Sequence, residues 1–296
     1  MQKFFITPSH DELIHNSLRR DIFRYWRPTR VLGAGILALA VGVSIFPLLV
    51  MLDTVVTPMA ELAGTQQWIP NAPTMEHIFN TLVNPELRQW LKNSAILALG
   101  TTVFTLILAI PASFVLARRE FTGRRVFLNT VLITQTMSPV VLIVPMFSLF
   151  RQLSLVNTYA GVIIASTAFV LPFTIWLLVG FFRKVSFEME EAAALDGATG
   201  WRFVGRFLIP TSLPGITATG VYAFMYGWNE FIFSLTFLAG DNAKWPITIG
   251  IFSNAGLWNV QWQALMMTAL VGTLPILILF VALHHQLEEG LGGSTG

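Results

Sequence analysis

The sequence contains no cysteine, and only 11% of its 296 residues are charged. Without cysteine, the chain can form no disulfide, no thiolate zinc site and no cysteine nucleophile. A soluble domain normally has about 25% charged residues, whereas here 54% of the residues are hydrophobic and the mean hydropathy is +0.65. A water-soluble fold could not bury so much apolar surface, so the composition predicts an integral membrane protein.

Six long apolar stretches divide the chain, and each has the roughly 20 residues that a helix needs to cross a bilayer. We therefore predict an all-α membrane protein with a short N-terminal segment, residues 1–30, and a transmembrane domain, residues 31–290. The first stretch is longer than the apolar core of a signal peptide, and no clear cleavage site follows it. The six predicted spans are 31–52, 94–117, 126–150, 159–182, 213–238 and 263–283.

The positive charges predict an orientation for these spans. Fourteen of the 18 lysines and arginines lie before the first span or in the loops after the second and fourth spans. Because positive residues are retained on the cytoplasmic side, both termini are predicted to be cytoplasmic. The basic residues form no single patch, so nucleic acid is not an expected partner. The long outer loops, 53–93 and 239–262, either contact a partner protein or only connect helices.

Residues 186–210, between the fourth and fifth spans, are the most informative stretch and read SFEMEEAAALDGATGWRFVGRFLIP. Ser186 can cap a helix whose first turn contains glutamates, which interact favourably with the helix dipole. Gly197 can adopt the left-handed conformation that ends a helix, Thr199 can cap a second helix, and Pro210 is predicted to end it. Such a helix pair either inserts into a groove of another protein or forms a structural elbow at the headgroups.

This stretch resembles the EAA loop of permease subunits of ATP-binding-cassette importers. The family pattern is Glu-Ala-Ala, three residues, Gly, nine residues, Ile, one residue, Leu-Pro, and this chain keeps the spacing with Phe207 for the isoleucine and Ile209 for the leucine. Asn93-Ser94 and Ala117-Arg118 also resemble the carbohydrate branch that contains the six-helix maltose permease subunit. The residues that match the ATPase-coupling motif are Glu191, Ala192, Ala193, Asp196, Gly197 and Pro210.

The resemblance implies a type I importer permease fold in the bacterial cytoplasmic (inner) membrane, moving a sugar or sugar derivative that the sequence does not identify. It implies three kinds of protein partner besides lipid: a second permease subunit in a heterodimer, two ATPase subunits that bind ATP and Mg²⁺, and an external solute-binding protein. None of the four lysines follows a glycine, as a P-loop would require. The chain is therefore expected to be non-catalytic and to hold no cofactor and no metal itself.

A polar and aromatic stripe in the fifth stretch is the predicted solute pathway. Tyr222, Tyr226, Asn229 and Phe233 recur at helical spacing, with Glu230 beside them, and would form one face of a continuous helix. Aromatic rings stack on sugars, and amides or carboxylates accept hydrogen bonds from hydroxyls. The alternative interpretation is aromatic packing with a hydrogen bond at a subunit interface.

Two other functional classes also fit six spans. In a carrier driven by an ion gradient, Glu230 would bind the proton or sodium ion, but the spacing of the loop at 186–210 argues against that class. A membrane-embedded enzyme is disfavoured because the sequence contains no HExxH or GxSxG motif.

Overall fold

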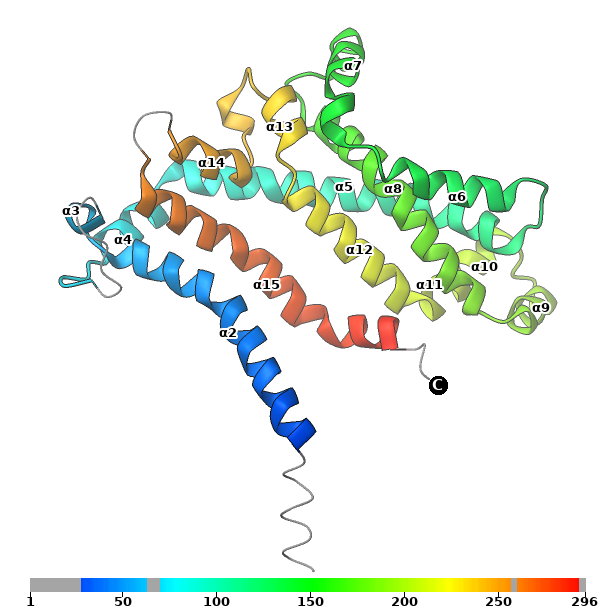
Figure 1. Cartoon of the computed structure of the whole chain (residues 1–296). Coiled ribbons are helices and arrows are strands. Elements are labelled where there is room, and N and C mark those ends of the chain that lie inside the picture. The colour runs from blue at the N-terminus through cyan, green and yellow to red at the C-terminus, as the bar shows by residue number, and fades with distance from the viewer. Residues whose placement is uncertain (1–27, 63–69, 257–259, 293–296) are drawn as a thin grey trace, which may run out of the picture. The chain divides into compact units, whose positions relative to one another are not determined.

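The computed structural model describes residues 28–62, 70–256 and 260–292, and every regular element in these ranges is a helix (Figure 1). The predicted all-α class is therefore confirmed. Most of the predicted N-terminal segment, residues 1–27, lies outside the described residues. The described ranges contain four helices long and apolar enough to cross a membrane, and two bent helix pairs raise the number of candidate spans to six.

The chain divides into two units, residues 1–53 and 54–296, which we describe separately. The first unit contains most of α2 (Pro28–Val56), which includes the whole predicted span 31–52. Pro47 lies inside α2 and removes one N–H group from its hydrogen-bond ladder, a loss that membrane helices tolerate.

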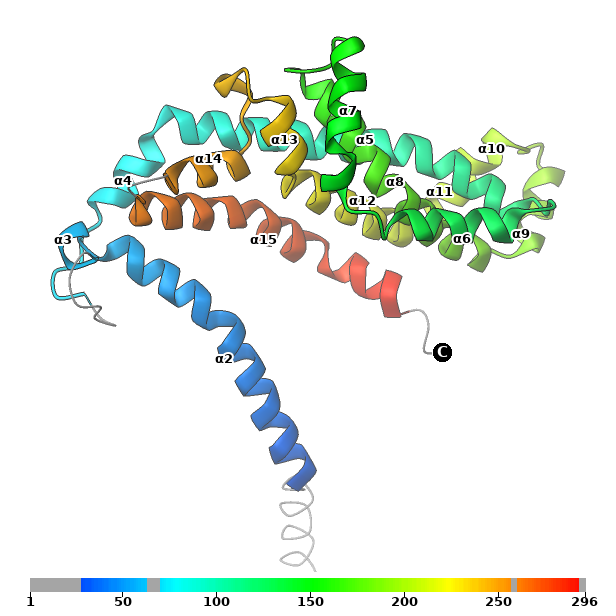
Figure 2. The same ribbon diagram turned by 45° about the horizontal axis from the view of Figure 1, so that its top comes forward.

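Three helices form the core of the second unit, and each contacts the other two (Figures 1 and 2). They are α5 (Pro85–Arg118), α8 (Tyr159–Lys184) and α12 (Leu213–Trp228). The Ser113 hydroxyl on α5 donates to the Ile175 carbonyl on α8 at 3.2 Å. The Trp228 indole donates at 3.0 Å to a carbonyl of α15 (Trp262–Gly292), the last helix. These bonds join helices through polar groups that lipid could not satisfy.

Helix α5 begins nine residues before the predicted span 94–117. The Asn84 side chain accepts a hydrogen bond from the Glu86 N–H at 2.9 Å, and Pro85 occupies the first helical position. Both residues favour a helix start, because the cap satisfies a free N–H and proline has none to lose. Much of the predicted outer loop 53–93 is therefore helical.

Gly227 lets α12 approach α5 closely. A Cβ atom added there would lie 2.9 Å from Ala98 Cα and 3.1 Å from Thr101 Cβ, and small residues at such crossings allow membrane helices to pack. We expect Gly227→Val to lower the free energy of unfolding by about 1–3 kcal/mol, measured as a lower melting temperature in detergent. Gly180→Val on α8 is the matched control, because an added Cβ meets no atom there within 4 Å. Equal melting temperatures for the two variants would contradict this packing.

The predicted span 126–150 is not one helix. It consists of α6 (Arg124–Thr134) and α7 (Pro139–Gln152), which are bent by 96°. The break precedes Pro139, whose ring disfavours helical backbone at Ser138, and Ser138 is extended with ψ 132°. The apolar stretch is continuous in the sequence, but the structure divides it into two helices at Pro139.

The predicted span 213–238 is also divided, into α12 and α13 (Ile232–Phe237). The Asn229 amide donates to the Met225 carbonyl at 2.8 Å and so satisfies the end of α12. The Glu230 carboxylate then accepts hydrogen bonds at the start of α13. Two adjacent polar side chains thus make the break possible inside an apolar stretch.

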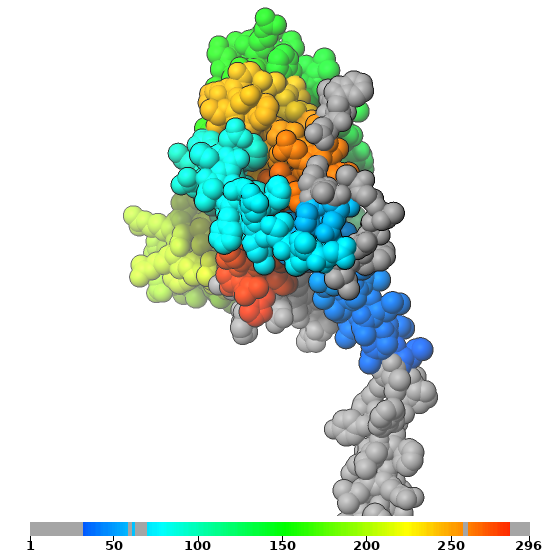
Figure 3. Space-filling view, turned by 90° about the vertical axis from the view of Figure 1, so that its left-hand side faces the viewer, coloured from blue at the N-terminus to red at the C-terminus, as the bar shows by residue number. Residues whose placement is uncertain are grey.

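Short helices fill the predicted outer loops at the end of the unit that we call the α14 end. They are α3 (Met59–Leu62), α4 (Glu76–Val83), η2 (Asn242–Lys244) and α14 (Ile247–Asn254). Figure 3 shows the cyan part of the chain, which includes α4 and the start of α5, beside the orange part around α14, and α5 and α14 are in contact. The described parts of these loops are therefore largely helical.

Asn93 is the central hydrogen-bonding residue of the α14 end. Its fully buried side chain donates to the carbonyls of Ala243 and Trp245 at 2.9 and 2.8 Å and accepts from the Tyr159 hydroxyl at 2.8 Å. Nearby, the hydrogen bond from Lys244 lowers the pKa of the Asp241 carboxyl. Satisfied buried polar networks of this kind fix one arrangement of the helices that meet there.

Candidate functional site

Helix α9 (Phe187–Leu195) is the first helix of the predicted coupling loop, and it ends in a Schellman motif. Gly197 has φ +77°, the left-handed conformation that the sequence predicts. Its N–H donates to the Ala194 carbonyl at 3.0 Å, and the Ala198 N–H donates to the Ala193 carbonyl at 2.8 Å. The chain therefore reverses sharply at a position where glycine is strongly favoured.

The start of α9 differs from the prediction. Ser186 occupies the N-cap position, but its side chain makes no capping hydrogen bond. Hydrogen bonds from the Glu188 backbone N–H and from the Ser186 side chain lower the pKa of the Glu188 carboxyl. The predicted capping role of Ser186 is wrong, whereas the acidic first turn is present.

The second helix of the loop is irregular. It consists of α10 (Trp201–Phe203), the π-helical turn η1 (Val204–Leu208) and α11 (Ile209–Thr211). Its N-cap is Gly200 and not Thr199, and the segment continues through Pro210 before it meets α12 at 84°. The Ile209 N–H donates to the Val204 carbonyl five residues earlier, and this wider turn accommodates a proline that would strain a regular α-helix. The predictions for Thr199 and Pro210 are therefore wrong.

Arg118, the last residue of α5, holds α9 in place. Its side chain is 5% exposed, lies 3.3 Å from the Glu190 carboxylate, and donates to the Val185 carbonyl at 3.0 Å. Its guanidinium also lies 5.0 Å from the centre of the Phe187 ring. One residue thus contacts both the end of α8 and the first turn of α9, a role that its terminal position in an apolar stretch could have signalled.

The predicted motif residues lie on two faces of α9. Ala193 is buried against α5 and α8 in one apolar cluster, whereas Glu191, Ala192 and Asp196 are exposed. Glu191 and Arg118 line a hollow of about 400 Å³ between α5 and α9. Figures 1 and 2 place α9 at the end of the unit where α5 and α8 terminate.

Three large apolar side chains of this loop are exposed. Leu195 is 90% exposed, Trp201 67% and Phe187 62%. Large apolar side chains on a short charged loop mark a surface that contacts another molecule. We call these three residues the apolar ridge.

The predicted pathway residues are only partly brought together. Tyr222 and Tyr226 are half-buried on α12, and Asn229 is exposed at its end. Phe233 lies on α13, is 1% exposed and packs against Phe169 with ring centres 5.3 Å apart. The prediction of one helical face that includes Phe233 is wrong because α12 ends before it.

Glu230 is buried and acts as the N-terminal cap of α13. Its carboxylate accepts from the N–H groups of Phe233 at 2.6 Å and Ser234 at 2.8 Å, and also from the Ser234 hydroxyl. Its own carbonyl accepts from the Thr248 hydroxyl at 2.7 Å. Charge-assisted bonds to free helix N–H groups explain how a carboxylate is accommodated in this position.

We expect Glu230→Gln to keep most of the predicted transport activity, because an amide oxygen can still accept at the start of α13. Glu230→Ala should lower the free energy of unfolding by about 1–3 kcal/mol, since buried N–H groups lose their acceptor. Melting temperatures and uptake by the assembled transporter measure the two effects. If Glu230→Gln abolished uptake while the melting temperature stayed unchanged, Glu230 would be an ion or solute ligand and the capping role insufficient.

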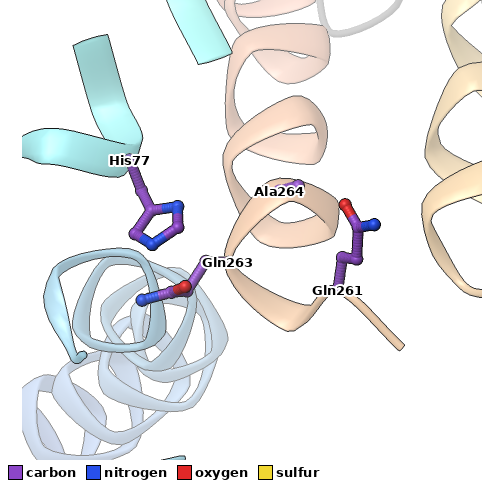
Figure 4. A pocket seen from close by; sticks show the side chains of 4 residues that line it. All are labelled: His77, Gln261, Gln263 and Ala264. Atoms are coloured by element: carbon purple, nitrogen blue, oxygen red, sulfur yellow. The ribbon is translucent and has the colours of Figure 1, made fainter. Parts of the chain in front are cut away.

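A small hollow of about 160 Å³ lies at the α14 end. Its lining residues are His77, Gln261, Gln263 and Ala264 (Figure 4). In Figure 4 the His77 ring and the Gln263 side chain point toward one another, and the Gln263 amide donates to the Thr57 carbonyl. Gln263 is buried, whereas the half-buried His77 and the exposed Gln261 can form hydrogen bonds with a protein surface.

Comparison with known proteins identifies the family. Residues 109–292 match the model of the binding-protein-dependent transport system inner membrane component. The chain is also 30% identical to the sulfoquinovosyl glycerol transport system permease protein SmoH of Agrobacterium fabrum, over 91% of this chain and 94% of that protein. The chain belongs to the family of binding-protein-dependent inner membrane components. This permease is accordingly a multi-pass inner membrane protein, and it works with other components of such a transport system.

Further relatives have the same architecture. The permease is 26% identical to the trehalose transport system permease protein SugB of Mycobacterium tuberculosis, over 86% of this chain and 92% of that protein. Its fold matches a solved bacterial ABC transporter involved in the import of the acidic polysaccharide alginate, with a TM-score of 0.75 over 96% of this chain and all of that chain, at 17% identity. The predicted importer permease fold is therefore confirmed.

Proposed function

We propose that this chain is the permease subunit of an ATP-binding-cassette importer that moves a sugar or sugar derivative into the cytoplasm. The observation that supports it most strongly is the loop at 186–210: α9 is fixed by Arg118 and presents the apolar ridge at an arginine-rich end of the molecule. This ridge inserts into a groove of a separate ATPase subunit, which binds ATP and Mg²⁺. The permease itself performs no catalysis.

The transporter contains two permease subunits, a heterodimer in our proposal, with two ATPase subunits and an external solute-binding protein. The excess of positive charge near α9 supports a cytoplasmic position for that end, and in our proposal the α14 end faces the binding protein. His77 and Gln261, which line the hollow and are accessible, provide suitable hydrogen-bonding groups for it. Both termini of the permease are cytoplasmic in this arrangement.

Coupling follows from the rigid attachment of α9. When ATP closes the ATPase pair, the two EAA loops move together, and each loop transmits the movement to α5 and α8 through Arg118 and the buried Ala193. The spans then change from an inward-facing to an outward-facing arrangement. ATP hydrolysis resets the transporter.

A sugar or sugar derivative is the proposed solute because relatives over most of the chain are named for sulfoquinovosyl glycerol, diacetylchitobiose and trehalose transport. Tyr222, Tyr226 and Asn229 are the proposed contacts in this subunit, with rings that can stack on a sugar and an exposed amide. A thermal-shift screen of the cognate binding protein against sugars and sugar acids identifies the solute. A binding protein stabilised only by amino acids or peptides would contradict the sugar class.

Uptake into membrane vesicles distinguishes the importer from an ion-driven carrier. With the complete transporter and its solute-loaded binding protein, we expect uptake to require ATP and to persist after an uncoupler abolishes the ion gradients. Uptake that continues without ATP and stops on uncoupling would support the carrier instead.

A further inference from the structure

A third hollow, of about 600 Å³, lies where α5 ends, α6 begins and α8 ends, and Figure 2 shows these three helix ends. We call it the arginine hollow. The lining residues used in this argument are Glu120, Arg124, Arg125, Leu128, Trp176 and Arg183. It is separate from the hollow between α5 and α9, and the coupling mechanism does not use it.

The arginine hollow has an excess of positive charge. Arg124, Arg125 and Arg183 face one carboxylate, Glu120, and none of the three takes part in the ion pairs found within the described ranges. Arg124 donates to the Ala117 carbonyl at 3.2 Å, and its buried Nε has no hydrogen-bond partner. The first turn of α6 contains no acidic residue, although acidic side chains are favoured there. The charges therefore lack a partner within the described part of the chain.

The wall of the hollow changes from cationic to apolar along the helices. On α8, Trp176 lies seven residues before Arg183, about 10 Å away along the helix axis. The Trp176 side chain is 42% exposed. On α6, Leu128 follows Arg125 by one turn and is half-buried. Three candidate spans terminate here, so the arginines lie at headgroup depth and the apolar residues at the depth of the upper acyl chains.

We propose that the arginine hollow binds an anionic phospholipid of the cytoplasmic leaflet. Its phosphate pairs with Arg125 and Arg183, and an acyl chain lies against Leu128 and Trp176. A free phosphate would match the arginines but leave the apolar wall uncovered. A basic pocket between membrane helices with an apolar lower wall fits both parts of a lipid. This inference does not depend on the identity of the transported solute.

The test uses the complete transporter, purified through a tag on this chain, with native mass spectrometry to count bound lipids. The probes are phosphatidylglycerol, phosphatidylcholine with the same acyl chains, and soluble glycerol phosphate. We expect phosphatidylglycerol to bind about tenfold more strongly than phosphatidylcholine. The double variant Arg125→Gln/Arg183→Gln should lower the affinity for phosphatidylglycerol about tenfold. Both arginines are exposed, and Arg124 keeps its bond to the end of α5, so assembly should persist.

The matched control is Arg88→Gln/Arg151→Gln, which removes two exposed charges elsewhere and should leave phosphatidylglycerol binding unchanged. Trp176→Ala, a second and independent variant, should weaken phosphatidylglycerol binding through loss of the acyl-chain contact. The proposal is overturned if the hollow variant binds as tightly as the native protein, or if the control loses as much affinity. It is also overturned if glycerol phosphate competes fully at the lipid's concentration, which would indicate a soluble-anion site.

Discussion

Replacing Gly197 by valine is expected to reduce solute-stimulated ATP hydrolysis by the assembled transporter about tenfold or more, because little over 1 kcal/mol of lost coupling has that effect. Gly197 has φ +77°, a conformation that costs non-glycine residues about 1–2 kcal/mol and β-branched ones most. An added Cβ meets no atom within 4 Å, so the strain arises from the backbone and not from a clash. The variant should relax by moving Leu195 and the following helix away from the ATPase groove.

Gly197→Asn is the matched control for this prediction. Asparagine adopts left-handed backbone more readily than other side chains, and the space around position 197 is open. We expect this variant to retain most of the stimulated hydrolysis. Both variants are compared at equal assembly with the ATPase, measured by copurification. Full activity of a correctly assembled Gly197→Val transporter would show that the turn at the end of α9 does not transmit movement.

Removing the Arg118 side chain is expected to have a comparably large effect. Arg118→Ala leaves the Val185 carbonyl without its charged donor and releases Glu190 and Phe187 together. A hydrogen bond from a charged group contributes about 1.5–3 kcal/mol, whereas the ion pair contributes less because Glu190 is 34% exposed. We expect ATP hydrolysis to continue but solute uptake per ATP to fall several-fold.

Two variants give this prediction its specificity. Arg118→Lys keeps the charge but lacks the planar guanidinium that lets arginine contact several acceptors at once. We therefore expect its solute uptake per ATP to lie between those of the native protein and Arg118→Ala. Arg151→Ala removes an exposed arginine at the end of α7, and uptake per ATP should stay unchanged. An Arg118→Ala transporter with the native ratio of uptake to hydrolysis would contradict the positioning role of Arg118.

The long apolar helices could be predicted from the sequence because bilayer thickness fixes their length. The breaks could not, since they depend on local competition among a few groups. Pro139 disfavours helix at Ser138, and Asn229 and Glu230 satisfy two helix ends within an apolar stretch. Apolar periodicity continues across both breaks, so Phe233 was placed on the wrong helix.

In the coupling loop, too, some features could be predicted from the sequence and others could not. Its glycine turn was predictable because few residues other than glycine favour that backbone conformation, and Gly197 adopts it. The caps were not, because Ser186 and Thr199 are only compatible with capping: Ser186 occupies the N-cap position without a side-chain capping bond, and Gly200 is the N-cap of the second helix. Arg118 was missed as the residue that holds α9, since its three contacts depend on how α5, α8 and α9 meet.

The absence of cysteine from this chain allows the central claim to be tested directly. Leu195→Cys places a single thiol on the apolar ridge, at a side chain that is 90% exposed. Phe79→Cys places one on α4, where the native side chain is 66% exposed. In the complete transporter, a short thiol-to-amine cross-linker should join position 195, but not position 79, to the ATPase subunit, with a yield that changes when ATP is added. Equal ATPase cross-linking from both positions, or none from position 195 in an intact complex, would contradict coupling through this loop.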